Sequence, residues 1–108
     1  VTGVQTCALP IYAVDDDQSY QIAGDIFQRL NQPLASESIY KKGISKFPES
    51  GVLYNELGVL LWEQGNDEAI NYWEKGIETE PNYSKNYYNA ANYYYFKNSK
   101  KYSYFNDT

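Results

Sequence analysis

Apolar and small residues recur three and four positions apart through most of this chain. One such stripe consists of Tyr54, Leu57, Gly58 and Leu61. A spacing of three and four residues places side chains on one side of an α-helix, because the helix completes a turn in about 3.6 residues. The pattern therefore predicts a series of helices, each with one buried face.

Residues that favour helix ends stand between these stripes. The side chains that can accept a hydrogen bond from a free amide at a helix start are Asp16, Ser50 and Ser84. Pro33 suits the first turn of a helix, and Gly65 suits the residue after a helix. Pro48 and Pro81 stand where a helix is expected to stop. The sequence thus marks the beginnings and ends of several helices.

The same kinds of residue recur about 34 positions apart. Tyr20 and Tyr54 are separated by 34 positions, and Tyr87 follows after 33 more. A second set occurs twice, 33 positions apart, as Ser36, Tyr40, Gly43, Ile44 and Pro48 and then as Ala69, Trp73, Gly76, Ile77 and Pro81. The chain therefore contains an internal repeat with two helices in each unit.

This recurring set resembles the tetratricopeptide repeat, a helix-turn-helix unit of 34 residues with aromatic, small and proline positions in that order. The resemblance covers residues 17 to about 98, with small departures such as Ala90-Ala91 in place of Leu-Gly and Ser36 in place of alanine. It implies an all-α fold, a right-handed α-solenoid of antiparallel helix pairs with about two and a half repeats.

The repeat period divides the chain into four segments. We expect an unstructured N-terminal segment at 1–16, a first repeat at 17–50, a second at 51–83 and a partial third at 84–108. Residues 99–108 stand where a second helix would follow in the third repeat, but they carry few of its marker residues. The chain is therefore expected to stop within a repeat, with these last residues forming a short helix or a frayed end.

Glycines occupy the predicted buried stripes at Gly24, Gly43, Gly58 and Gly76. Glycine inside a helix costs roughly 1 kcal/mol against alanine. Its recurrence at stripe positions therefore indicates a close approach of two helices. We predict that leucine at Gly58 or Gly76 is severely destabilising, whereas leucine at Asn71 is mild.

Composition narrows the possible partners. The chain carries 14 Asp plus Glu against 9 Lys plus Arg, a net charge of -5, and its local basic cluster is confined to Lys97, Lys100 and Lys101. A nucleic-acid partner is therefore not expected, since binders of phosphate usually present a basic face. The sequence has no run of about 20 apolar residues that could span a membrane. Its richness in Tyr, Asn, Lys, Ile and Phe is compatible with an AT-rich microbial, for example bacterial, genome.

Val1–Ile11 follow none of the helical pattern. Their sequence, VTGVQTCALPI, resembles a sequencing-library adapter translated in frame. We interpret the segment as an artefact and not as a signal peptide, because it lacks a basic flank; the alternative is a natural disordered N-terminus. If the segment is an adapter artefact, Cys7 does not belong to the natural protein. Deleting the segment is expected to change the free energy of unfolding by less than about 0.5 kcal/mol.

The side chains for common catalytic and metal sites are missing or wrongly spaced. There is no histidine, and the single cysteine is Cys7, which argues against most nucleophilic sites and zinc sites. Asp15–Asp17 lack the alternate spacing, glycine and closing glutamate of a calcium loop. Other carboxylates are expected on solvated faces, namely Glu63, Asp67, Glu68 and Glu74. We therefore expect no catalytic, cofactor-binding or metal-binding residues and no enzymatic activity.

The tyrosines of the third repeat divide between two sides of a helix. Tyr87 and Tyr94 continue the predicted core stripe, whereas Tyr88 and Tyr95 lie elsewhere. In the tetratricopeptide family the first helices line the concave surface. By that resemblance a peptide-binding groove would contain Gln21, Asp25, Gln28, Asn55, Val59, Trp62, Tyr88, Asn92 and Tyr95, with Glu56 and Asn89 at its edge. Asparagine amides can both donate to and accept from a peptide backbone.

The resemblance implies a non-catalytic module that binds a protein or peptide segment on its concave face. Members that bind the acidic tails of chaperones grip a carboxylate there, but Gln21 and Asp25 stand at the matching places, and an aspartate would repel it. Two alternatives remain. The segment could be a structural spacer or assembly element of a larger envelope or secretion protein, or the regulatory arm of an enzyme encoded outside it.

Overall fold

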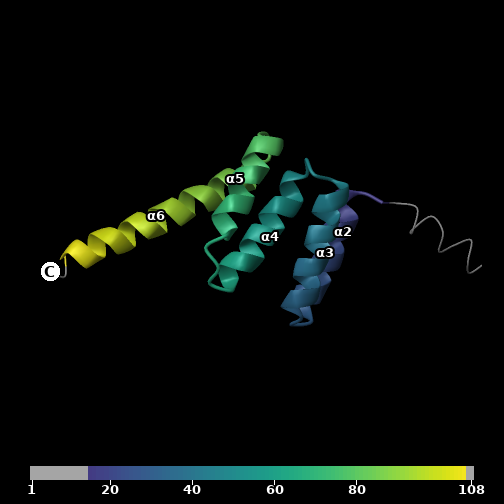
Figure 1. Cartoon of the computed structure of the whole chain (residues 1–108), viewed down its shortest axis with the longest axis horizontal. Helices are drawn as coiled ribbons and strands as arrows, with labels where there is room; N and C mark the ends of the chain where they lie inside the picture. The colour runs from purple at the N-terminus through teal and green to yellow at the C-terminus, as the bar shows by residue number, and fades with distance from the viewer. Residues whose placement is uncertain (1–14, 107–108) are drawn as a thin grey trace, which may run out of the picture.

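A computed structural model describes residues 15–106, which fold into α-helices joined by short turns (Figure 1). In chain order the helices are α2 (Asp17–Arg29), α3 (Pro33–Lys46), α4 (Gly51–Glu63), α5 (Ala69–Thr79) and α6 (Ser84–Asn106). No strand occurs in this part of the chain, so the predicted all-α class is confirmed. The segment Val1–Ile11, including Cys7, lies outside the described residues.

The helix ends follow the residues that predicted them. The Asp16 side chain accepts a hydrogen bond from the Ser19 amide at 2.9 Å and caps α2, and Ser50 does the same for Leu53 in α4 at 3.3 Å. Pro33 begins α3, and Gly65 adopts a φ of 75° after α4. These predictions are confirmed. Ser84 differs, because it is the first residue of α6 and does not precede it.

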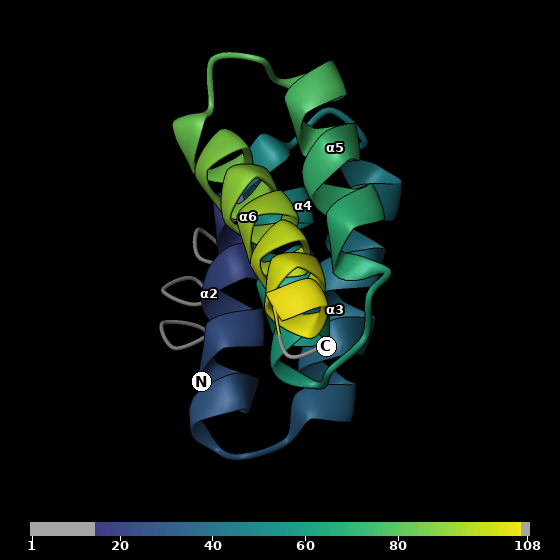
Figure 2. The ribbon, with the colours of Figure 1, turned by 90° about the vertical axis from the view of Figure 1, so that its left-hand side faces the viewer.

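Each helix packs against the next helix in the chain, and α4 is the centre of the arrangement. Besides α3 and α5, α4 also contacts α2 and α6, so α4 lies between these two first helices (Figures 1 and 2). Within the described residues, no Cα atom of α2 or α3 lies within 8 Å of a Cα atom of α5 or α6. The core is built largely from α4, whose buried apolar residues are Leu53, Tyr54, Leu57, Leu60 and Leu61.

An aromatic ring on the second helix of each pair lies against a glycine on the first. The Tyr40 ring covers Gly24, and the Trp73 ring covers Gly58. A Cβ atom built on Gly58 would stand 2.6 Å from Cδ1 of Trp73, closer than carbon atoms normally approach. The glycines and the rings recur at the repeat spacing, so the same packing occurs twice. The predicted close helix approach is confirmed at both places.

The remaining stripe glycines join one helix pair to the next. Gly43 lies against Leu53, where a Cβ atom would come within 2.8 Å of its Cδ1, and Gly76 lies against Asn86. Asn86 occupies the position equivalent to Leu53, 33 residues later. It is fully buried and donates from Nδ2 to the Gly51 carbonyl at 2.9 Å. A polar side chain therefore stands at this junction, where the preceding junction has Leu53.

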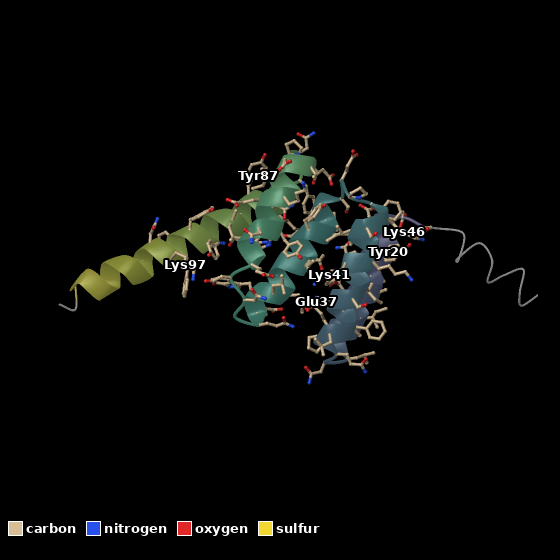
Figure 3. All side chains as sticks on the ribbon, in the orientation of Figure 1. Tyr20, Glu37, Lys41, Lys46, Tyr87 and Lys97 are labelled. Carbon is tan, nitrogen blue, oxygen red and sulfur yellow. The ribbon has the colours of Figure 1, made fainter. Side chains whose placement is uncertain are left out.

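Two expectations for the last helix are wrong. Tyr87 and Tyr94, predicted to be core residues, are 45% and 48% exposed, and Tyr87 projects from α6 into solvent (Figure 3). The Tyr94 hydroxyl donates to Oε2 of Glu74 on α5 at 2.6 Å, but in the described part of the chain no later helix covers that side of α6, so both rings stay half exposed. The backbone also stays helical to Asn106 without a turn near residue 98, and α6 extends beyond α5 (Figure 1).

On the surface of α3, one predicted ion pair is present. Glu37 and Lys41 on α3 form the i,i+4 ion pair that their spacing allows, at 2.8 Å (Figure 3). Among the helices described, none combines the length and the apolar character needed to cross a membrane.

Candidate functional site

Two adjoining hollows run across the face formed by α2, α4 and α6, and they share Val59 and Glu63. The first, here called the acidic hollow, measures ≈ 250 Å³ and is lined by Asp25, Gln28, Arg29, Glu56, Val59 and Glu63. The second, here called the aromatic hollow, measures ≈ 500 Å³ and is lined by Val59, Trp62, Glu63, Trp73, Asn89, Asn92, Tyr93, Tyr95, Phe96 and Ser99. Together they form one groove across three helices.

The buried Tyr40 hydroxyl of α3 forms hydrogen bonds with three residues that line the acidic hollow. This hydroxyl donates to Oδ1 of Asp25 at 2.6 Å and accepts from Nε2 of Gln28 at 2.8 Å. Its oxygen also stands 3.3 Å from Oε2 of Glu56. The cluster therefore ties α2, α3 and α4 together through polar groups, while the carboxylates remain part of the hollow's wall.

The surroundings of Glu56 raise the pKa of its carboxyl group above its ordinary value. Burial, with the adjacent Asp25 carboxylate as the next cause, raises the pKa of the Glu56 carboxyl to about 7. Burial also raises the pKa of the Tyr40 hydroxyl, with the hydrogen bond to Asp25 as the next cause. The acidic hollow therefore contains a carboxyl group whose charge changes near neutral pH.

The aromatic hollow is built around Trp62, which is partly buried. Its ring meets the edges or faces of Tyr93 and Phe96 at centroid distances of 5.6 and 5.4 Å, with interplanar angles of 69° and 89°. The ring centroid of the buried Trp73 lies 6.2 Å from that of Trp62. Such edge-to-face contacts are favourable arrangements of aromatic quadrupoles. Tyr95 stands at the rim and is 74% exposed, so part of the aromatic surface faces solvent.

Asn55 lies beneath the groove and not on it. Only 3% of its surface is exposed. Its side-chain oxygen accepts a hydrogen bond from Nδ2 of Asn89 at 2.6 Å, and its backbone carbonyl accepts one from Nε1 of Trp73 at 3.3 Å. Asn55 thus joins α4 to α5 and α6. Asn89 is half-buried and still lines the aromatic hollow.

The structure brings together most of the residues predicted for the groove. Those that line a hollow are Asp25, Gln28, Glu56, Val59, Trp62, Asn89, Asn92 and Tyr95. Gln21 is half-buried and Tyr88 is 70% exposed, but neither lines the acidic hollow or the aromatic hollow. Gln21, Asn55 and Tyr88 are equivalent positions of the three first helices. These three positions therefore do not line the hollows: Asn55 is buried beneath them, and Gln21 and Tyr88 lie outside them.

Sequence reasoning missed several lining residues that a simple spacing rule could have found. Arg29, Glu63 and Phe96 line the hollows, and they are equivalent positions near the ends of the first helices. Glu63 follows Glu56 by seven residues, and Phe96 follows Asn89 by seven. Seven residues are close to two helical turns, which keeps both side chains on one side of the helix.

A larger hollow of ≈ 640 Å³ lies at the turn between α3 and α4, but its polar groups already serve the fold. Asp17 accepts from the Ser50 hydroxyl at 2.8 Å, and Glu80 accepts from the Gly51 amide at 2.7 Å. Lys46 pairs with Asp15 at 2.8 Å. These bonds close the turns around α4, so we assign this hollow a structural role.

Within the described residues, no three or more acidic side chains form a group that could hold a metal ion. Comparison of the sequence with models of known protein families and with curated proteins finds no match.

Proposed function

We propose that this protein is a tetratricopeptide-like α-solenoid segment that binds a peptide or protein segment along the α2–α4–α6 face and carries out no chemistry. The observation that carries the proposal is the pair of adjoining hollows, which cross three neighbouring helices and share Val59 and Glu63. A groove of this form suits an extended chain better than a compact small molecule, because its two halves are open and lie side by side.

The repeated packing supports the tetratricopeptide-like arrangement. Tyr40 on Gly24 and Trp73 on Gly58 are the same contact made in two successive helix pairs. In a stack of such pairs each unit touches only its neighbours. The contacts of α4 with both α2 and α6 have this character.

The groove offers the two kinds of contact that peptide recognition needs. The amides of Gln28, Asn89 and Asn92 can donate to and accept from a peptide backbone. Tyr95 and Trp62 supply a large contact area with few rotatable bonds. The carboxylates of the acidic hollow, with the net charge of -5, disfavour a phosphate-bearing partner.

The proposal can be tested by selecting random displayed peptides on the protein and mapping where they bind. We expect the selected peptides to lose at least about tenfold in affinity for Tyr95→Glu, because the new charge stands at the rim of the aromatic hollow. Tyr88→Glu is the matched control, since Tyr88 lies on the same helix with similar exposure, 70% against 74%, and lines neither hollow. Selected peptides that bind both variants equally well would refute the groove.

One observation favours a second candidate, an assembly role. The side of α6 that carries Tyr87, Ala91 and Tyr94 is exposed, although the equivalent side of α4 packs against α5. If this side joins a second copy of the chain, sedimentation should show self-association that Tyr87→Arg abolishes. A protein that stays monomeric at high concentration would refute this candidate without affecting the groove.

A further inference from the structure

We infer that the preferred occupant of the groove is a polyproline-like segment with a lysine or arginine and, three positions away, a bulky apolar residue. The cation would occupy the acidic hollow and the apolar side chain the aromatic hollow. This inference rests on the proposed groove and specifies the chemistry of its partner.

The charge of the acidic hollow favours lysine or arginine as the residue of the bound segment that occupies it. The acidic hollow presents the carboxyl groups of Asp25, Glu56 and Glu63 against one guanidinium, that of Arg29. Asp25 is held in place by the Tyr40 hydroxyl at 2.6 Å, so its orientation is fixed before a ligand arrives. Electrostatic attraction is stronger at partly buried groups than on an open surface, because water screens it less. A cationic side chain is therefore favoured and an acidic one is repelled.

The shape and the apolar lining of the aromatic hollow favour a bulky apolar residue of the bound segment. The aromatic hollow combines Trp62, Tyr93 and Phe96 with the apolar side chain of Val59. The rings are already arranged edge to face around Trp62, and a further aromatic or large aliphatic side chain would continue that cluster. Burying such a side chain removes apolar surface from water, which is the main source of affinity at a site of this kind.

Geometry sets the spacing between the two residues. One hollow lies between α2 and α4 and the other between α4 and α6, so their centres are separated by about one helix spacing, roughly 8–10 Å. In a polyproline II helix, residues three apart lie on the same side and about 9 Å apart. A β-strand puts same-side residues about 7 or 13 Å apart. The polyproline-like form therefore fits best, in either chain direction.

Protonation of Glu56 should modulate the binding. The charged or titratable groups around it are Asp25 of α2, Tyr40 of α3, Lys85 of α6 and Tyr83 of the turn before α6, with Glu63 and Arg29 in the same hollow. A bound lysine favours the ionised carboxylate. Since the pKa of Glu56 is about 7, affinity should rise up to about tenfold between pH 6 and pH 8.

The test uses labelled, proline-rich synthetic peptides of eight residues and fluorescence anisotropy with the full chain. The matched peptides carry lysine and phenylalanine three positions apart, in both orders. One control replaces the lysine with glutamate, and another places lysine and phenylalanine next to each other. We expect the better matched peptide to bind at least about tenfold more tightly than either control.

Protein variants assign the contacts. Glu63→Gln and Asp25→Asn should each weaken the matched peptide about three- to tenfold. The matched control is Glu78→Gln, because Glu78 is exposed on α5 outside both hollows and loses the same charge. Since Asp25 also bonds Tyr40, Glu63→Gln is the decisive variant.

The outcomes separate this inference from the proposed function. If the glutamate peptide or the adjacent-residue peptide binds as well as the matched one, the inference is overturned while the groove stands. The same holds if Glu63→Gln has no effect on the matched peptide. If neither these peptides nor any selected from random libraries respond to Tyr95→Glu, both the inference and the groove fail.

Discussion

The close packing of Trp73 on Gly58 makes a sharp prediction about alanine at that glycine. In an exposed helix, Gly→Ala stabilises by about 1 kcal/mol, because alanine has the higher helix propensity. At Gly58 the added Cβ would lie 2.6 Å from Cδ1 of Trp73. Trp73 is only 3% exposed and its Nε1 donates to the Asn55 carbonyl at 3.3 Å, so its ring has little room to move. We expect Gly58→Ala to destabilise.

The size of the effect follows from two opposed contributions. Extra carbon atoms in a well-packed contact typically cost about 1–3 kcal/mol, and the gain in helix propensity offsets up to about 1 kcal/mol of this. With the full offset, the net cost of Gly58→Ala is therefore about 0–2 kcal/mol, and the short 2.6 Å approach to Cδ1 of Trp73 places it toward the upper end of that range. Gly58→Leu should cost at least about 3 kcal/mol. Asn71→Leu, on the exposed side of α5, should stay within about 0.5 kcal/mol.

Urea denaturation followed by far-UV circular dichroism measures these differences, and the fluorescence of Trp62 and Trp73 gives a second signal. Gly58→Ala combined with Trp73→Phe should cost less than the sum of the two single changes, because a smaller ring relieves the overlap. If Gly58→Ala stabilises the protein, or if Gly58→Ala, Gly58→Leu and Asn71→Leu cost the same, Gly58 is not a packing contact.

Three further predictions concern the polar groups under the groove. Because the pKa of Glu56 is raised from its ordinary value of 4.5 to about 7, the folded state binds more protons between these values, and the free energy of unfolding should fall as pH rises through that window. Partial exposure limits the loss to about 1–2 kcal/mol, and a Glu56→Gln profile that is equally steep would contradict this origin. Tyr40→Phe should cost about 1–3 kcal/mol in urea denaturation, since a carboxylate loses its donor, whereas Tyr88→Phe should cost almost nothing. Asn55→Ala should destabilise by about 1–2 kcal/mol, because the Asn89 amide loses its buried partner, while Asn92→Ala, at an exposed position, should leave the melting curve unchanged.

Local chemistry made most helix ends predictable from the sequence. Asp16 and Ser50 cap helices through bonds that each residue type makes wherever a helix starts. Pro33 and Gly65 restrict the backbone in ways that depend little on the rest of the fold. The paired glycines were informative for a related reason, because a costly residue at a buried position indicates a neighbour that needs the space.

Burial itself was harder to predict, because it depends on what a side chain finds next to it. Tyr87 and Tyr94 continue the stripe that is buried in α4, yet they are exposed since no described helix covers them. Asn55 was expected on the groove surface, but the amide of Asn89 lies within 2.6 Å and draws it into a buried pair. Asn86 fills a leucine-like position for which periodicity gives no polar signal. These outcomes depend on pairs of residues, which a helical period does not specify.

Since α2 and α3 meet α5 and α6 only through α4, the two ends of the molecule can open independently. Detachment of α6 would remove the aromatic hollow and leave the acidic hollow in place, and detachment of α2 would do the reverse. Amides of α4 should then exchange with solvent most slowly, and probes at the two ends should report different midpoints on heating. A partner that fills both hollows would hold α2 and α6 to α4 at once, so its binding would make the unfolding of the two ends a single cooperative event.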